Sequence, residues 1–147
     1  MMARVALKRG FAVVAALSLI GLVAPTVFAD NEPYDGSDPH STGCDSSAWT
    51  PYSRTINGNL LELRFSSNCQ TAWARFTCND SNGCTNYTLW VTRVQDQKQQ
   101  IQHVTWPNYT DTGTSLYTLQ NYDAGSYQNY ACYQGYFGAP QYCTSAY

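Results

Sequence analysis

Cysteine and histidine are the residues of this chain with the broadest chemistry, because they form disulfides, bind metal ions or take part in catalysis. The chain has six cysteines and two histidines. The cysteines are Cys44, Cys69, Cys78, Cys84, Cys132 and Cys143. An even number of cysteines in a chain of this size favours a disulfide framework. A zinc site is the alternative, but neither a Cys-x-x-Cys pair nor a histidine beside a cysteine occurs.

The spacing of the cysteines favours some of the fifteen formal pairings over others. Cys78 and Cys84 bracket five residues and are favoured as a local bridge. Cys132 and Cys143 flank a glycine-rich segment and would join a C-terminal hairpin. The first two cysteines would then close a 26-residue loop, which stabilises a fold by about 3 kcal/mol through lost chain entropy. A crossed pairing, such as Cys44 with Cys132, stays open.

Catalysis receives little support from the histidines. His40 lies beside Ser41 in a polar N-terminal segment, and His103 lies on a predicted strand. Serine and aspartate are plentiful, so a Ser-His-Asp triad can be assembled on paper, but no nucleophile-elbow pattern accompanies it. We therefore expect no enzymatic activity, no cofactor and no metal site.

The acidic residues also lack a specific catalytic or metal-binding pattern. A glycosidase pair drawn from Asp35, Asp38, Asp45 and Glu62 has no supporting motif. Asp35-Gly36-Ser37-Asp38 could supply oxygen ligands to calcium, but it lacks the Asp-x-Asp-x-Asp-Gly spacing of a dedicated loop. We interpret this segment as a turn, and whether Asp35 and Asp38 bind an ion stays open.

The first 29 residues predict a secretory signal peptide. Arg4, Lys8 and Arg9 precede an apolar run over 10–23, and Val27-Phe28-Ala29 places small residues at the −3 and −1 positions of a cleavage site. The run is short for a membrane span, which takes roughly 20 apolar residues. We expect a secreted, extracellular protein that has no membrane contact after cleavage.

The net charge of the mature chain narrows the classes of partner that are expected. Residues 30–147 hold five basic and ten acidic residues, which leaves a net charge of about −5. Nucleic acids and anionic membranes need clustered Lys and Arg, so neither is expected as a partner. An extracellular glycan or protein is expected instead.

The strongest strand signals lie between residues 55 and 106. Apolar and polar residues alternate over 61–66, a polar loop follows, and 71–78 continues as the next strand. A hairpin with Phe65 opposite Ala72 would place Glu62 against Arg75 and Arg64 against Trp73 in the adjoining pairs. That register predicts a salt bridge and a cation–π contact on one face. We expect these four polar and aromatic residues to be structural.

The remaining patterns complete an all-β chain. Residues 86–94 and 99–106 predict a second hairpin with its turn at Asp96 and Gln97, and short strands follow near 115–119, 127–134 and 140–145. The core residues expected from this hairpin are Leu89, Val91, Ile101, Val104 and Trp106. We predict a single, small β-barrel or β-sandwich domain over 44–147, stapled by disulfides. An extended N-terminal arm over 30–43, with turns at Asp35-Gly36 and Asp38-Pro39, precedes it.

Tyrosine is concentrated in the C-terminal part of the chain, with eight residues between Tyr117 and Tyr147. Aromatic rings on short strands commonly fill a core or cover a sheet. Exposed rings also form platforms for sugars or proteins. Core and cover are the preferred interpretation, and a binding surface is the alternative.

Motifs along the mature chain resemble those of one bacterial family. They are Tyr34-Asp35-Gly36-Ser37-Asp38-Pro39, Thr42-Gly43-Cys44, Glu62-Leu63-Arg64-Phe65-Ser66 with Cys69, Thr71-Ala72-Trp73-Ala74-Arg75, Ala131-Cys132 and Cys143-Thr144-Ser145-Ala146-Tyr147. This pattern is similar to an uncharacterised family of secreted exoproteins that includes the YjfA-like proteins. Cys78 and Cys84 depart from it as an added pair, and Ala146-Tyr147 stands where Trp-Tyr is expected. The resemblance implies export and a β-rich domain of unknown function, with no catalytic residues to carry over.

The function favoured by these observations is non-catalytic binding of a glycan or a protein outside the cell. A secreted protease inhibitor and a small hydrolase are the alternatives. A glycan binder predicts coplanar exposed rings with polar neighbours, and an inhibitor predicts a rigid, protruding loop such as 79–83. A hydrolase predicts His40 or His103 within reach of Ser and Asp in a cleft.

Overall fold

The computed structural model describes residues 32–105, 107–136 and 138–147. The predicted signal peptide, residues 30 and 31 of the predicted arm, and Trp106 lie outside this part of the chain. Among the described residues, no helix has the length and apolar character needed to cross a membrane.

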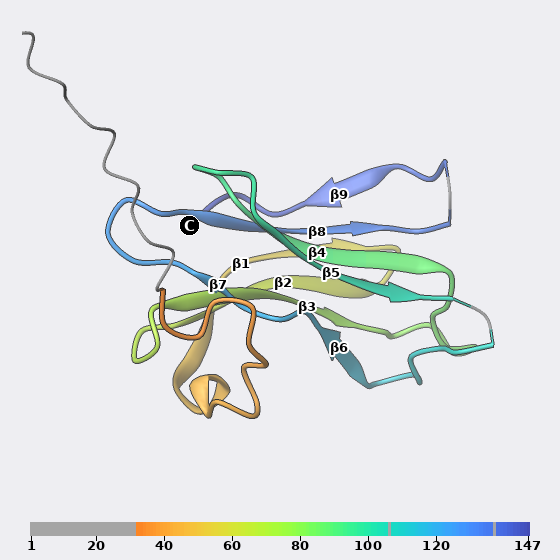
Figure 1. Cartoon of the computed structure of the whole chain (residues 1–147). Coiled ribbons are helices and arrows are strands. Elements are labelled where there is room, and N and C mark those ends of the chain that lie inside the picture. Colours follow the sequence, from red (N-terminus) through yellow and green to blue (C-terminus); the bar gives the residue numbers. More distant parts are fainter. Residues whose placement is uncertain (1–31, 106, 137) are drawn as a thin grey trace, which may run out of the picture. The chain divides into compact units, whose positions relative to one another are not determined.

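Two antiparallel sheets pack face to face (Figure 1). The first has the order β1-β2-β3-β6, and β7 also pairs with β3; the second has the order β5-β4-β8-β9. The strands of the first sheet are β1 (Ala48–Ile56), β2 (Asn59–Ser66), β3 (Thr71–Thr77), β6 (Ser115–Tyr117) and β7 (Asn121–Tyr122). Those of the second are β4 (Tyr87–Arg93), β5 (Gln99–Val104), β8 (Asn129–Gln134) and β9 (Gln141–Cys143). A single 3-10 turn, η1 (Cys44–Ser47), precedes β1. The all-β prediction is confirmed, and the architecture is the sandwich.

The core lies between the inner faces of the two sheets. Along β3, Ala72, Ala74 and Phe76 point inward at every second position and are fully buried. They meet Leu89 and Val91 of β4, which are also fully buried. Because side chains alternate across a strand, the neighbours of these residues on β3 must lie on the outer face.

The register of the β2–β3 hairpin is the one that the sequence predicted. Phe65 pairs with Ala72, Glu62 with Arg75, and Arg64 with Trp73. These last four residues therefore share the outer face of the first sheet, opposite the core.

The prediction that Ile101 lies in the core is wrong. Ile101 pairs with Trp90 and is 49% exposed, whereas Leu89, Val91 and Val104 are buried as expected. The alternation along β5 places Ile101 on the face opposite Val104, and the residues that share the face of Val104 are Gln100 and Gln102.

Strand β1 was missed by the sequence reasoning, although a signal for it was present. Asn57 and Gly58 connect β1 to β2 with φ angles of 49° and 87°. Both positive angles are those of a tight hairpin turn, for which Asn-Gly is the favoured sequence. Pro51 obscures the strand, and the pairing is irregular between Trp49 and Tyr52. An edge strand tolerates such a proline, because one side of it makes no ladder bonds.

Three disulfides hold the sandwich, and they follow the spacing of the cysteines. Cys78 joins Cys84, and Cys132 joins Cys143 across paired strands. The remaining two cysteines, at the 3-10 turn and in the β2–β3 loop, form the third bridge. The crossed pairing is therefore not the one adopted.

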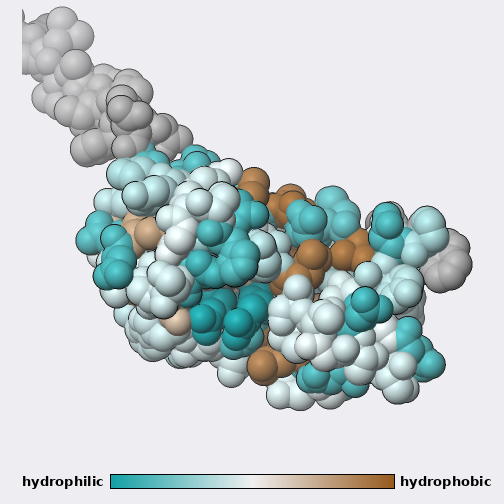
Figure 2. Space-filling model, turned by 90° about the horizontal axis from the view of Figure 1, so that it is seen from below, coloured by the Kyte–Doolittle hydropathy of each residue, from teal (hydrophilic) through white to brown (hydrophobic). Residues whose placement is uncertain are grey.

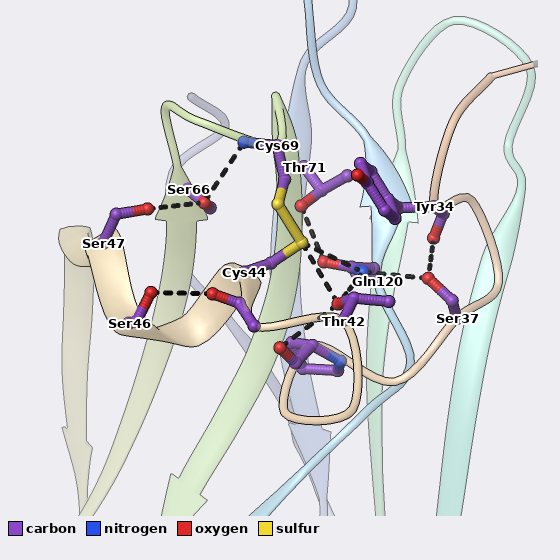
Figure 3. Close-up of a disulfide and its surroundings, with 12 residues drawn as sticks. Tyr34, Ser37, Thr42, Cys44, Ser46, Ser47, Ser66, Cys69, Thr71 and Gln120 are labelled. Atoms are coloured by element: carbon purple, nitrogen blue, oxygen red, sulfur yellow. Dashed lines mark hydrogen bonds between the residues drawn. A yellow bond between two sulfur atoms is a disulfide. The ribbon is translucent and has the colours of Figure 1, made fainter.

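The N-terminal segment packs against the sandwich through turns and one central glutamine. The backbone N–H groups of Gly36 and Gln120 donate to the carbonyls of Gln120 and Ser37, over 2.8 and 3.0 Å. The side chain of Gln120 accepts from Thr71 at 2.6 Å and donates to Ser37 and Thr42 at 2.9 and 3.1 Å, beside the Cys44 sulfur (Figure 3). Gln120 is fully buried and satisfied, so it fixes the segment to the sheet.

Candidate binding pocket

The outer face of the first sheet carries a pocket of about 220 Å³. Its walls come from the N-terminal segment, the 3-10 turn, β2, β3 and β6. The lining residues are Pro39, His40, Asp45, Arg64, Trp73, Arg75, Ser115 and Tyr117. Figure 2 shows the molecule from below the view of Figure 1, on the side of this sheet, where hydrophilic residues form a contiguous area. Three of the four residues singled out on the β2–β3 hairpin thus line one cavity.

The fourth residue, Glu62, lies beneath the pocket and holds Arg75 in place. Arg75 donates from Nε and Nη2 to the two carboxylate oxygens of Glu62, at 2.6 and 2.9 Å. Thr50 of β1 donates to the same carboxylate at 2.8 Å. Burial by itself raises the pKa of Glu62, but the hydrogen bonds from Arg75 and Thr50 outweigh it, and its pKa lies below the ordinary value. The predicted salt bridge is confirmed.

Arg64 makes different contacts from those the sequence predicted. Its guanidinium donates to Thr50 Oγ1 at 2.7 Å and to the Ala48 carbonyl at 2.8 Å, so it reaches across to β1. No cation–π contact with Trp73 occurs among the ring contacts of the described residues, and that expectation is wrong. Burial, and then the nearby charge of Arg75, lower the pKa of Arg64. The carboxylates of Glu62 and Asp45 act in the opposite direction and offset part of this lowering of the pKa.

The two histidines lie in different places. His40 Nδ1 bonds the Asp45 carboxylate at the pocket mouth, and its ring lies 6.0 Å from that of Tyr117. Ser115 also lines the pocket, but its hydroxyl bonds Thr77 at 2.7 Å. His103 bonds Thr88 at 3.0 Å on the second sheet. The pocket has a His–Asp pair, and no hydrogen bond joins His40 to a serine hydroxyl among the described residues.

The other motif residues act in the N-terminal segment. Asp38 accepts from the backbone N–H groups of His40 and Ser41, at 2.7 and 3.1 Å, which is the bonding of a turn-forming aspartate. Tyr34 and Gly36 have positive φ angles of 68° and 73°. The first of these bonds holds the backbone at His40, whose side chain lines the pocket.

Asp35 belongs to a separate charged cluster, which sequence reasoning missed. Arg93 of β4 is 1% exposed and bonds both Asp96 and Glu32, and Asp35 lies 3.6 Å away. Lys98 also pairs with Asp35. Hydrogen bonding to Asp96 raises the pKa of Arg93, and the same contact lowers the pKa of Asp96 to about 2. This cluster, which we call the arginine clamp (Glu32, Asp35, Arg93, Asp96 and Lys98), ties the start of the described chain to the second sheet.

A second buried charge, Asp123, follows β7. It is 6% exposed, and its Oδ2 has no hydrogen-bond partner among the described residues. Burial raises its pKa to about 7, because a hydrogen bond with Asn129 offsets only part of the desolvation. The folded protein therefore holds this proton over a pH range in which the unfolded chain has lost it.

Asp123 gives the protein a pH-dependent stability. Because its folded pKa lies above its unfolded value, its contribution is complete below about pH 4 and is lost as the pH rises through 7. Between pH 5 and pH 8 the wild type should lose about 2–3 kcal/mol in its free energy of unfolding through this group, and Asp123→Asn should not show that loss. Urea unfolding at several pH values measures this difference. Asp111→Asn, at an exposed position, is the matched control; parallel pH curves for wild type and Asp123→Asn would contradict the expectation.

The tyrosines divide between the core and the surface. Phe76 and Tyr133 stack between the sheets, with ring centres 4.5 Å apart and an interplanar angle of 14°. Trp49, Tyr52 and Tyr147 are exposed and touch one another at 84° and 67°. These measured pairs are edge-on, so they do not form the flat, coplanar platform that a glycan binder predicts at the surface.

The loop over 79–83, the inhibitor candidate, is a tight turn. Gly83 donates its backbone N–H to the Asp80 carbonyl at 3.0 Å, and Asn82 donates to the Asp80 carboxylate at 2.9 Å. An extended backbone is what the inhibitor hypothesis predicts at this loop, and this turn does not supply it.

Comparison with known proteins places this chain in a family. The sequence profile of a protein family of unknown function, DUF2690, matches residues 32–132, which include every residue that lines the pocket. The uncharacterized protein YjfA of Bacillus subtilis (strain 168) is 31% identical over 86 residues. That alignment covers 54% of this chain and 55% of YjfA, so the chain spans about half the length of this relative. No solved structure matches. The chain belongs to the DUF2690 family of proteins of unknown function.

Proposed function

We propose that this protein is a secreted, non-catalytic binding module that takes one unit of an extracellular glycan into the pocket. The observation that carries the proposal is the lining of the pocket, where the half-buried ring of Tyr117 lies with the polar groups of His40, Asp45 and Arg64. Trp73 also lines the pocket, but it is 3% exposed and offers little of its ring to a ligand. Aromatic rings cover the apolar faces of a sugar, while charged and polar groups bond its hydroxyls.

The size of the pocket supports a small ligand. Its volume of about 220 Å³ is below the roughly 300 Å³ at which pockets for drug-sized ligands begin. One sugar ring fits this scale better than a folded protein surface does. Three disulfides support an oxidising compartment, in which such glycans are encountered.

The experiment is a binding assay of the disulfide-bonded protein on immobilised polysaccharides. Tyr117→Ala removes a ring from the pocket, and Tyr109→Ala, at a 58% exposed position outside it, is the matched control. We expect wild type and Tyr109→Ala to bind and Tyr117→Ala to lose at least tenfold in affinity. If Tyr117→Ala still binds as tightly as the wild type, the glycan does not bind in this pocket. If no glycan is captured at all, the proposal of a glycan-binding module is overturned.

A small hydrolase is the second candidate, and the His40–Asp45 pair is the observation that favours it. A histidine held at Nδ1 by a carboxylate leaves Nε2 available as a general base. The absence of a hydroxyl bonded to His40 among the described residues speaks for binding without catalysis. Release of reducing sugar from a bound polysaccharide, lost in His40→Ala, would reverse this ranking.

A further inference from the structure

We propose that the pocket recognises a carboxylate on the sugar, with Arg64 as the group that binds it; this inference rests on the proposed function and names its ligand class. An acidic sugar, such as a uronic acid, unites the two features of the lining. The Tyr117 ring contacts the sugar and the Arg64 guanidinium binds the acid group.

The first support is the placement of positive charge. Residues 30–147 contain five basic residues in a chain segment whose net charge is about −5. Two of these five, Arg64 and Arg75, line this one small pocket. The charge of Arg75 opposes that of Arg64, and the carboxylates of Glu62 and Asp45 offset part of this repulsion. A ligand of opposite charge removes that repulsion.

The second support is that the two arginines are compensated unequally. Arg75 is held by both oxygens of Glu62, so its charge is matched. The hydrogen bonds of Arg64 go to a hydroxyl and to a backbone carbonyl, both of which are neutral. Asp45, the one carboxylate in the lining, is bonded by His40. Arg64 is thus the cation of the pocket without a hydrogen-bonded carboxylate among the described residues.

The third support is the geometry of the Arg64 side chain. Its bonds to Thr50 and Ala48 hold the guanidinium in a fixed orientation on β2. They occupy two of its five N–H donors. Its other donors have no hydrogen-bond partner within the described part of the chain. An arginine fixed in advance loses less side-chain entropy when a carboxylate binds. The lowered pKa of Arg64 agrees with this, because a bound anion would stabilise its charge.

The Tyr117 ring decides between an acidic sugar and a bare anion. Phosphate or acetate would use the guanidinium alone, and the half-buried ring of Tyr117 would add nothing. A sugar ring that carries a carboxylate contacts both the guanidinium and the Tyr117 ring. An acidic peptide offers the same carboxylate without the sugar ring, and the experiment treats it as a separate outcome.

The test is a titration of the disulfide-bonded protein, followed by ¹H–¹⁵N NMR, with three acidic sugars and their neutral counterparts. The pairs are glucuronate with glucose, galacturonate with galactose, and N-acetylmuramate with N-acetylglucosamine. We expect at least one acid to bind tenfold or more tightly than its neutral counterpart. Arg64→Gln should abolish that preference, and Arg64→Lys should retain part of it. Arg54→Gln makes the same charge change at an exposed position outside the pocket and should retain it fully.

The outcomes separate this inference from the proposed function. If acidic and neutral sugars bind equally well and Tyr117→Ala loses that binding, carboxylate recognition is overturned and the proposal of a glycan-binding module is retained. Phosphate, acetate or an acetylated Gly-Glu peptide binding as tightly as the best acidic sugar would overturn the sugar as the ligand. If no sugar binds and no polysaccharide retains the protein, both the carboxylate inference and the proposed glycan-binding function are overturned. An unchanged acid preference in Arg64→Gln would remove Arg64 from the role.

Discussion

Replacing Trp73 with alanine is expected to lower the free energy of unfolding by about 3–5 kcal/mol. Trp73 is 3% exposed although it lies on the outer face of the first sheet, where it lines the pocket together with Pro39 and His40 of the N-terminal segment. Its removal leaves a cavity beneath the ligand site and takes away the packing between β3 and that segment. Chemical denaturation, followed by tyrosine fluorescence and far-ultraviolet circular dichroism, measures the loss.

Trp49→Ala is the matched control for this prediction. It deletes the same side chain from a position that is 46% exposed on the edge strand β1, so we expect a loss of about 1 kcal/mol or less. If Trp73→Ala melts like the wild type and loses glycan binding, Trp73 is a ligand contact and not a packing residue. If Trp73→Ala and Trp49→Ala lose the same free energy of unfolding, burial of Trp73 does not determine the size of its effect.

Replacing Arg93 with leucine is expected to cost about 3–5 kcal/mol. The substitution removes the cation that Glu32 and Asp96 bond. Asp35, which is only 7% exposed, loses one of its two cations and keeps Lys98. The substitution also removes a guanidinium that lies 4.7 Å above the Tyr127 ring. The N-terminal segment should detach from the second sheet first, because Glu32 and Asp35 both lie on it.

Hydrogen exchange distinguishes that local detachment from global unfolding, and urea denaturation gives the total loss. Arg54→Leu, at an exposed position, is the control and should cost about 1 kcal/mol or less. In the wild type, Asp96 has a lowered pKa, so its contribution is present above pH 4 and declines as the pH falls toward 2. This acid sensitivity should be smaller in Arg93→Leu. A variant as stable as the wild type would mean that leucine packing replaces the whole clamp.

Local patterns predicted the parts of this fold that depend on neighbouring residues. The alternation over 61–66 and the short loop after it were enough to set the β2–β3 register, including Glu62 opposite Arg75. The cysteine spacing favoured the three bridges. The missed β1 shows that a hairpin signal, Asn57-Gly58, is easily overlooked when a proline interrupts the strand before it.

The parts that sequence could not predict are those that join distant segments. The pocket combines Pro39 and Asp45 with Tyr117, and nothing in their local patterns says that β6 pairs beside them. The arginine clamp likewise joins Glu32 to Arg93 across 61 positions. Ile101 failed for a simpler reason, since hydrophobicity alone does not say which face of an edge strand points inward.

The proline in β1 also bears on whether copies of this protein associate through their sheet edges. An exposed strand at the edge of a sheet invites a strand of another molecule to pair with it, and chains that pair in this way grow into aggregates. Pro51 has no N–H to offer an incoming strand, and the irregularity between Trp49 and Tyr52 breaks the even spacing that such a strand would need. Pro51, which obscures β1 in the sequence, thus disfavours pairing of this sheet edge with a strand of another molecule.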